Sequence, residues 1–244
     1  MYWVQGRERA GLKIGNRLLP WIAVGASLTT ALALGAVMGF NSPARTFDAT
    51  ASGDTYLSSF VPATNYGGAK MLWVSSGGGF ENWTLIKFDI SGRLRPGDLV
   101  VNAKMRLTVV DSNAARWPVV ITTGRTLTDW QENDTTFSTA PLFSFDTSTA
   151  TAVGVSGAPS PGAIFSIDVT KQVHRWHSYG GPSSFGTLIK IGPDVARGSI
   201  GFASRENSDF GKPMLEVTFQ PGPRTPYGYR LGVTSITVAT ARDE

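Results

Sequence analysis

Cysteine is absent from this chain of 244 residues, and histidine occurs only twice. Without cysteine the chain has no disulfide, no nucleophilic thiol and no thiolate ligand for a metal. His174 and His177 stand at i and i+3, a spacing that can present two imidazoles on one helix face, but no third ligand accompanies them. Neither lies in a nucleophile motif. We therefore expect no metal site and no cofactor, with both histidines on the surface.

An excess of positive charge is confined to the ends of the chain. The formal net charge is +4, yet positive and negative side chains balance over residues 18–220. The N-terminal excess comes from Arg7, Arg9, Lys13 and Arg17. Basicity placed there predicts contact of residues 1–17 with anionic lipid at the cytoplasmic face. Nucleic acid is not an expected partner.

Residues Leu18 to Phe40 carry no charge and are mostly apolar. At about 1.5 Å of rise per residue such a helix spans roughly 35 Å, enough for a hydrocarbon core of about 30 Å. The basic residues before it predict a cytoplasmic N-terminus and a single-pass protein of a bacterial-type inner membrane. The alternative is a cleaved signal peptide with small residues at Ser42 to Ala44, although signal h-regions run only about 7–15 residues.

The predicted span has a ridge of small residues on one face. Small side chains allow close helix approach in lipid, where hydrophobic attraction between helices is weak. The ridge predicts packing against other integral-membrane subunits, and it consists of Ala23, Ser27, Ala31, Gly35 and Gly39.

Beyond a linker at 41–47, the sequence alternates apolar and polar residues in short stretches separated by Gly, Pro and Asn turns. This pattern is typical of half-buried strands. Strands are expected within 85–90, 103–109, 119–121, 165–169, 187–191 and 215–219, one short helix over 170–177 capped by Asp168 or Thr170, and an exposed loop over 147–162. The expected fold is all-β, an antiparallel β-sandwich of jelly-roll type preceded by the single transmembrane helix.

Several weak motifs follow one another in order across residues 48–220. With them the chain resembles the DNRLRE-type domain, which is close to the disaggregatase-related repeats and to an alginate-binding class of carbohydrate-binding modules. The resemblance implies a β-jelly roll, an extracytoplasmic setting and no catalysis. It rests on Asp54-Thr55-Tyr56, Thr64-Asn65-Tyr66-Gly67, Leu72-Trp73-Val74, Leu85 to Ile90, Ala103 to Leu107, Asp129-Trp130-Gln131-Glu132, Ala140-Pro141, Ile167 to Thr170, Val173 to Trp176, Phe202 to Glu206 and Pro213-Met214-Leu215.

Acidic residues in these motifs offer an enzymatic alternative. Two carboxylates could form a glycosidase pair. More often such acids cap turns or pair with a neighbouring arginine, as Glu206 can with Arg205. We expect no enzyme activity from the acids at Asp89, Asp129, Glu132, Asp168 and Glu206.

Sugar binding requires exposed aromatic faces with polar groups around them. The motif positions predict that Trp73, Trp130 and Trp176 belong to the core. Trp83 and Trp117 lie in expected loops and are the candidate exposed aromatics. For an acidic polysaccharide, the candidate cations with outward strand parity are Lys87, Lys104, Arg106 and Lys190.

The tail at 221–244 is rich in Pro and Gly at first and then β-prone, so we expect it to become ordered only in contact with a neighbouring protein.

Together these features favour a non-enzymatic accessory subunit that stabilises a larger membrane complex, for instance a photosynthetic or respiratory one. The alternative is a membrane-anchored, periplasmic or extracellular module that binds acidic glycan.

Overall fold

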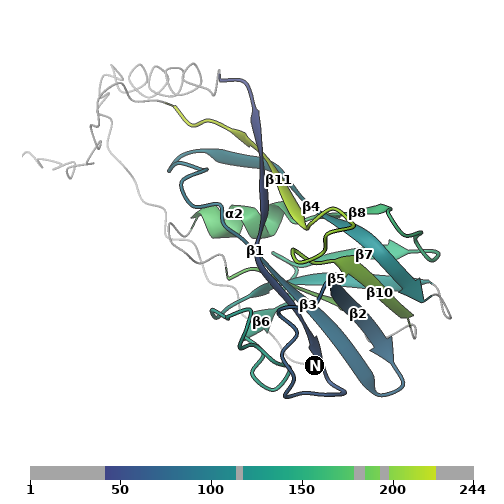
Figure 1. Ribbon diagram of the computed structural model, residues 1–244. Helices are drawn as coiled ribbons and strands as arrows, with labels where there is room; N and C mark the ends of the chain where they lie inside the picture. Colours follow the sequence, from purple (N-terminus) through teal and green to yellow (C-terminus); the bar gives the residue numbers. More distant parts are fainter. Residues whose placement is uncertain (1–41, 114–117, 179–184, 193–197, 224–244) are drawn as a thin grey trace, which may run out of the picture. The chain divides into compact units, whose positions relative to one another are not determined.

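A computed structural model describes residues 42–113, 118–178, 185–192 and 198–223. These ranges contain antiparallel strands and one helix (Figure 1). The elements are β1 (Arg45–Ser58), β2 (Met71–Gly77), β3 (Phe80–Phe88), β4 (Leu99–Asn113), β5 (Val119–Thr126), β6 (Phe143–Ser144), β7 (Thr151–Val155), β8 (Ile164–Asp168), α2 (Thr170–Ser178), β9 (Thr187–Ile191), β10 (Gly198–Ala203) and β11 (Met214–Gln220). The predicted all-β antiparallel sandwich is confirmed.

Two long strands, β1 and β4, each take part in both layers of the sandwich. The first half of β1 pairs with β11 and its second half with β3, with a register shift between Ala51 and Gly53. Strand β4 likewise pairs with β11 and β8 and then, nearer its end, with β10. Such irregularities bend a strand, which lets one strand pass from one sheet to the other.

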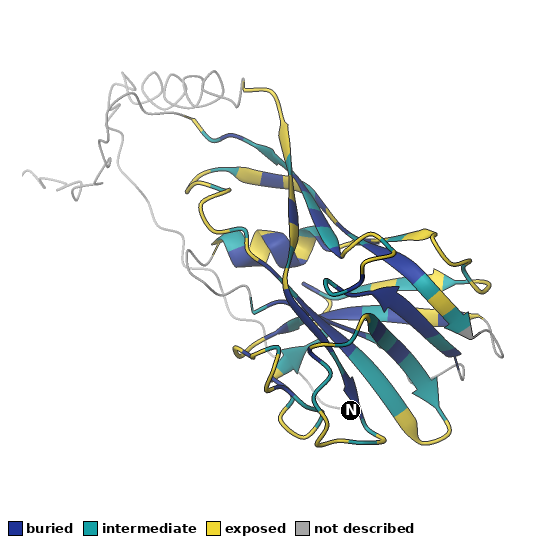
Figure 2. Cartoon of the chain, viewed as in Figure 1, coloured by how far each residue is buried: buried dark blue, intermediate teal, exposed yellow. Residues whose placement is uncertain are grey.

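The sheet built on β3 and β9 is covered on both faces. Ile86 and Ile189 point into the main core, while Leu85 and Leu188 belong to a second cluster with Leu57 and Trp130. Neighbouring strand residues point to opposite faces, so one strand can serve two cores. In Figure 2 the buried positions accordingly run along the strands and the exposed ones gather in the connections.

Helix α2 closes one edge of the main core with Val173 and Trp176. Its start is fixed by Asp168, whose carboxylate accepts a hydrogen bond of 2.8 Å from the Thr170 N–H. The Thr170 hydroxyl in turn accepts a bond of 2.8 Å from the Ala103 N–H of β4. The prediction of a helix there is confirmed. Of the two residues proposed to cap it, Asp168 does so, whereas the Thr170 side chain bonds β4.

The loop predicted over 147–162 is wrong in its middle, because Thr151–Val155 form β7 and pair with β5. Its β-branched residues at 151, 153 and 155 complete an open sheet edge, a tertiary effect that local periodicity does not show. The first strand begins at Arg45, before the expected domain start at 48. Within the described ranges, no helix has the length and apolarity needed to cross a membrane.

Other expectations concern residues outside the described ranges. These are the basic segment 1–17, the span 18–40 with its small-residue ridge, Trp117 and nearly all of the tail 221–244. They remain predictions.

Candidate functional site

Four half-buried aromatic rings and one lysine form a surface on the outer side of the β3–β9 sheet. We name it the aromatic–lysine surface; it comprises Trp83, Phe137, Phe143, Phe145 and Lys190. The Trp83 ring centroid lies 4.7 Å from that of Phe137 and 5.4 Å from that of Phe143. Lys190 Nζ lies 4.6 Å from the centroid of the Phe145 ring and 5.9 Å from that of Trp83.

Strand parity and one long connection create this surface. Trp83 shares a face with Leu85 on β3, and Lys190 shares a face with Leu188 on β9. The segment between β5 and β7 passes over that face and supplies the three phenylalanine rings. The Trp83 indole N–H donates a hydrogen bond of 2.7 Å to a Glu81 carboxylate oxygen, which fixes the ring.

The prediction that Trp83 is an exposed loop residue is therefore wrong in its placement. Trp83 lies on β3 and is half-buried, because the phenylalanine rings pack against it. Trp130 and Trp176 are core residues as predicted, exposing 4% and 3% of their surface. Trp73 is only half-buried, since it lies on the side of β2 opposite Leu72 and Val74.

Of the other basic candidates, Lys87 is already engaged by protein groups. Lys87 forms an ion pair of 2.6 Å with Asp129, and its Nζ lies 4.6 Å from the Trp130 ring centroid. The hydrogen bond from Lys87 is the main reason why the pKa of Asp129 is lowered from its usual value. In this arrangement Lys87 serves to hold the segment that covers the sheet.

Lys104 and Arg106 lie on β4, in the other sheet. Arg106 forms an ion pair of 3.4 Å with Glu216. Lys104 is exposed, and its register partners are Glu216 on one neighbouring strand and Asp168 on the other. Among the described residues, neither Lys190 nor Lys104 has a carboxylate within ion-pair distance, whereas Lys87 and Arg106 are paired. Lys190 differs from Lys104 because its Nζ lies against the Phe145 and Trp83 rings.

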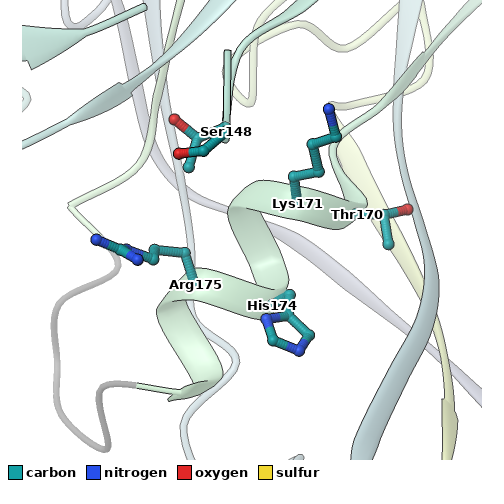
Figure 3. Close-up of a pocket in the computed structure, with 6 residues that line it drawn as sticks. Ser148, Thr170, Lys171, His174 and Arg175 are labelled. Carbon is teal, nitrogen blue, oxygen red and sulfur yellow. The ribbon is translucent and has the colours of Figure 1, made fainter. Parts of the chain in front are cut away.

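A shallow hollow of about 290 Å³ lies beside helix α2. It is lined by Ser148, Thr149, Thr170, Lys171, His174 and Arg175. In Figure 3, Lys171 and Arg175 extend from the helix on the side of Ser148. Lys171 Nζ donates a hydrogen bond of 3.3 Å to the Thr147 carbonyl. The hollow is cationic, but no Trp, Tyr or Phe ring lines it, so it lacks the large flat aromatic face on which a sugar ring packs.

The acidic motif residues meet around Glu132. One Glu132 carboxylate oxygen accepts a hydrogen bond of 2.8 Å from the Asp54 N–H, and the other lies 3.5 Å from Arg205 Nη1. Arg205 Nε also pairs with Glu206 at 3.1 Å, as the sequence suggested. The Asn65 side-chain amide donates to the Glu132 carbonyl at 2.7 Å. Thus Glu132 contacts residues from three of the other family-like motifs, namely those that contain Asp54, Asn65 and Arg205.

Asp54 is the most deeply buried acid of this group, with 1% of its surface exposed. Its Oδ2 accepts a hydrogen bond of 2.9 Å from the Arg205 N–H, while its Oδ1 is buried without a partner. Burial is the main cause that raises the pKa of Asp54 to about 8, and the Glu206 and Glu132 carboxylates act in the same direction. Sequence reasoning did not single out Asp54 as a site residue.

The remaining predictions about polar residues have mixed outcomes. Asp89 caps a turn by accepting a hydrogen bond of 2.9 Å from the Ser91 N–H. His174 is exposed as expected, whereas His177 is half-buried and hydrogen-bonds the Asp98 carbonyl at 2.9 Å. The sequence analysis also missed Phe137, Phe143 and Phe145 as members of a surface. Phe137 and Phe145 lie outside the strands, and β6, which carries Phe143, is too short to show alternation.

Comparison with known protein families gives one result for the β-domain. Residues 45–219 match the family described as Carbohydrate-binding module family 96. None of the curated proteins matches the chain. The matched segment runs from the start of β1 almost to the end of β11, and it covers well over half of the chain. The chain therefore belongs to carbohydrate-binding module family 96, and residues 45–219 form its carbohydrate-binding β-domain.

Proposed function

We propose that this protein binds an acidic polysaccharide, without catalysing a reaction, through the aromatic–lysine surface. The observation that carries the proposal is the position of Lys190 beside the Phe145 and Trp83 rings with no carboxylate partner among the described residues. Aromatic rings provide an apolar face for a sugar ring, and the ammonium group provides a counter-charge for a uronate carboxylate.

The proposal takes up the glycan-binding interpretation of the sequence in preference to the membrane-complex subunit. The family match supports carbohydrate binding, whereas nothing among the described residues supports a role as a subunit. The surface itself unites two of the predicted site residues, Trp83 and Lys190, which are far apart in the sequence. Lys87, Lys104 and Arg106 are not part of the proposed site.

Replacing Lys190 with alanine is expected to weaken binding to alginate, a polyuronate, by about tenfold, which corresponds to about 1.4 kcal/mol. Trp83→Ala is expected to weaken it at least as much, because it removes the ring against which Phe137 and Phe143 pack. The affinity of each variant for alginate is measured by titration calorimetry on the full chain. Binding by the unmodified protein should also weaken as the salt concentration rises, since salt screens exposed charges.

Lys104→Ala is the matched control, because it removes an exposed strand lysine of the same charge from the other sheet. It should leave the affinity unchanged. A loss of affinity with Lys171→Ala in place of Lys190→Ala would move the site to the hollow beside α2. Equal binding of alginate and of a neutral glucan, with no salt dependence, would show that the ligand is not an acidic polysaccharide.

The predicted span at 18–40 leads to a proposed location, the outer face of a cytoplasmic membrane. There the module would hold polysaccharide close to the cell surface, and the small-residue ridge would contact other membrane helices. Deleting residues 1–40 is expected to move the protein from the membrane fraction to the soluble fraction, measured by fractionation and immunoblotting. Retention of the shortened chain in the membrane fraction would contradict the proposed anchor.

A further inference from the structure

We propose that Asp54, Glu132 and Glu206 bind a hard divalent cation, Ca²⁺, that links β1 to the segments after β5 and β10. One carboxylate oxygen from each of the three residues lies within 4.8 Å of the others. Calcium binds oxygen at about 2.3–2.6 Å, so two ligands on opposite sides of the ion are about 4.8 Å apart. The spacing of the three oxygens thus suits one shared calcium ion.

Unpartnered oxygens provide an independent reason to place a cation here. Asp54 exposes 1% of its surface, and its Oδ1 is buried without a hydrogen-bond donor. Glu206 Oε2 is also buried and has no donor. A buried carboxylate oxygen without a partner is strongly unfavourable unless a cation or a proton neutralises it. Two such oxygens from neighbouring acids are the ligands that a metal ion would use.

The charge balance of the cluster also favours a divalent ion. Three carboxylates face one cation, Arg205, which pairs with Glu132 and Glu206 at 3.5 Å and 3.1 Å. The Arg205 contacts involve Glu132 Oε2 and Glu206 Oε1, whereas the oxygens without a partner are Asp54 Oδ1 and Glu206 Oε2. With all three acids ionised, the group has two unbalanced negative charges, which one Ca²⁺ would neutralise.

The cation would strengthen contacts that already join distant segments. Asp54 lies on β1, Glu132 lies in the segment that covers the β3–β9 sheet, and Glu206 follows β10. The Trp130 indole and the Glu132 side chain both come within 4.0 Å of the position that a side chain at Gly53 would occupy. Trp130 is therefore near enough to the cluster to report on an ion by energy transfer.

The test uses the full chain, purified in mild detergent and treated with a chelator. Adding Ca²⁺ at about one hundred times its Kd is expected to raise the Tm by roughly 5–10 °C. Terbium, which replaces calcium, should show luminescence on excitation of tryptophan, and Ca²⁺ should abolish it by competition. No Tm shift together with no sensitised terbium signal would overturn the proposal.

Amide variants locate the ion. Asp54→Asn and Glu206→Gln should each reduce the calcium-dependent Tm shift and the terbium signal at least tenfold. Glu216→Gln is the control: it removes a carboxylate on β11 and should leave both signals unchanged. If Asp54→Asn does not fold, Glu206→Gln and the titration of the unmodified chain decide the question. A calcium response that Glu216→Gln weakens as much as Glu206→Gln would reflect general surface charge and overturn the site.

Discussion

Replacing Trp176 with alanine is expected to lower the free energy of unfolding by about 3–5 kcal/mol. Trp176 exposes 3% of its surface and packs, together with Val173, from helix α2 into the main core. Removing the indole would leave a cavity between the helix and the sheets, which a rigid sandwich cannot fill by collapse. Domains of this size are stable by only about 5–15 kcal/mol, so the variant should lose a large fraction of its total stability.

The measurement is urea denaturation followed by circular dichroism, compared with the parent chain. His174→Ala is the matched control, since it alters an exposed position on the same helix and should change stability by less than about 0.5 kcal/mol. A Trp176→Ala variant with an unchanged denaturation midpoint would mean that the helix does not contribute to the core.

The strands are the part of this fold that the sequence predicts well. Alternation in Leu85 to Ile90 and in Ala103 to Val109 indicates strands. Strand β4 contains the second stretch in full, whereas β3 ends at Phe88, because Asp89 caps the turn that follows. Alternation alone, however, indicates one buried face. It does not reveal that the outer face of β3 is also covered, with Leu85 and Trp83 under the connection that carries Trp130 and Phe137. The sequence also places Trp83 in a loop, whereas β3 begins at Phe80 and includes it.

The candidate sites depend on contacts between distant segments, so the sequence predicts them only in part. The sequence offers Trp83 as a loop residue and Lys190 as a strand residue, and the pairing of β3 with β9 brings them together. The pairing of Arg205 with Glu206 could be read from their adjacency. The approach of both to Asp54 could not, because β1 comes from the other end of the domain.

Gly67 is a position at which the fold requires the absence of a side chain. A Cβ placed there would lie 2.3 Å from the Glu132 carbonyl oxygen, which belongs to the backbone and cannot rotate away. One side chain, that of Asn65, ties the two segments together. Its Oδ1 accepts a hydrogen bond of 3.1 Å from the Gly67 N–H, and its amide nitrogen donates bonds of 2.7 and 2.8 Å to the carbonyls of Glu132 and Thr135. The loop after β1 therefore fits closely against the segment that follows Trp130.

Gly67→Ala is accordingly expected to lower the free energy of unfolding by about 1–3 kcal/mol, the usual effect of overpacking a tight contact. Gly68→Ala is the matched control, because no atom lies within 4 Å of its Cβ position and neither glycine has a positive φ. The control should be neutral or slightly stabilising, since alanine restricts the unfolded chain. Both variants are compared by urea denaturation, with tryptophan fluorescence as a second signal that reports on Trp130. Because Glu132 has to move in Gly67→Ala, that variant should also weaken the hydrogen bond from the Asp54 N–H, whereas equal stability of the two variants would contradict the close contact.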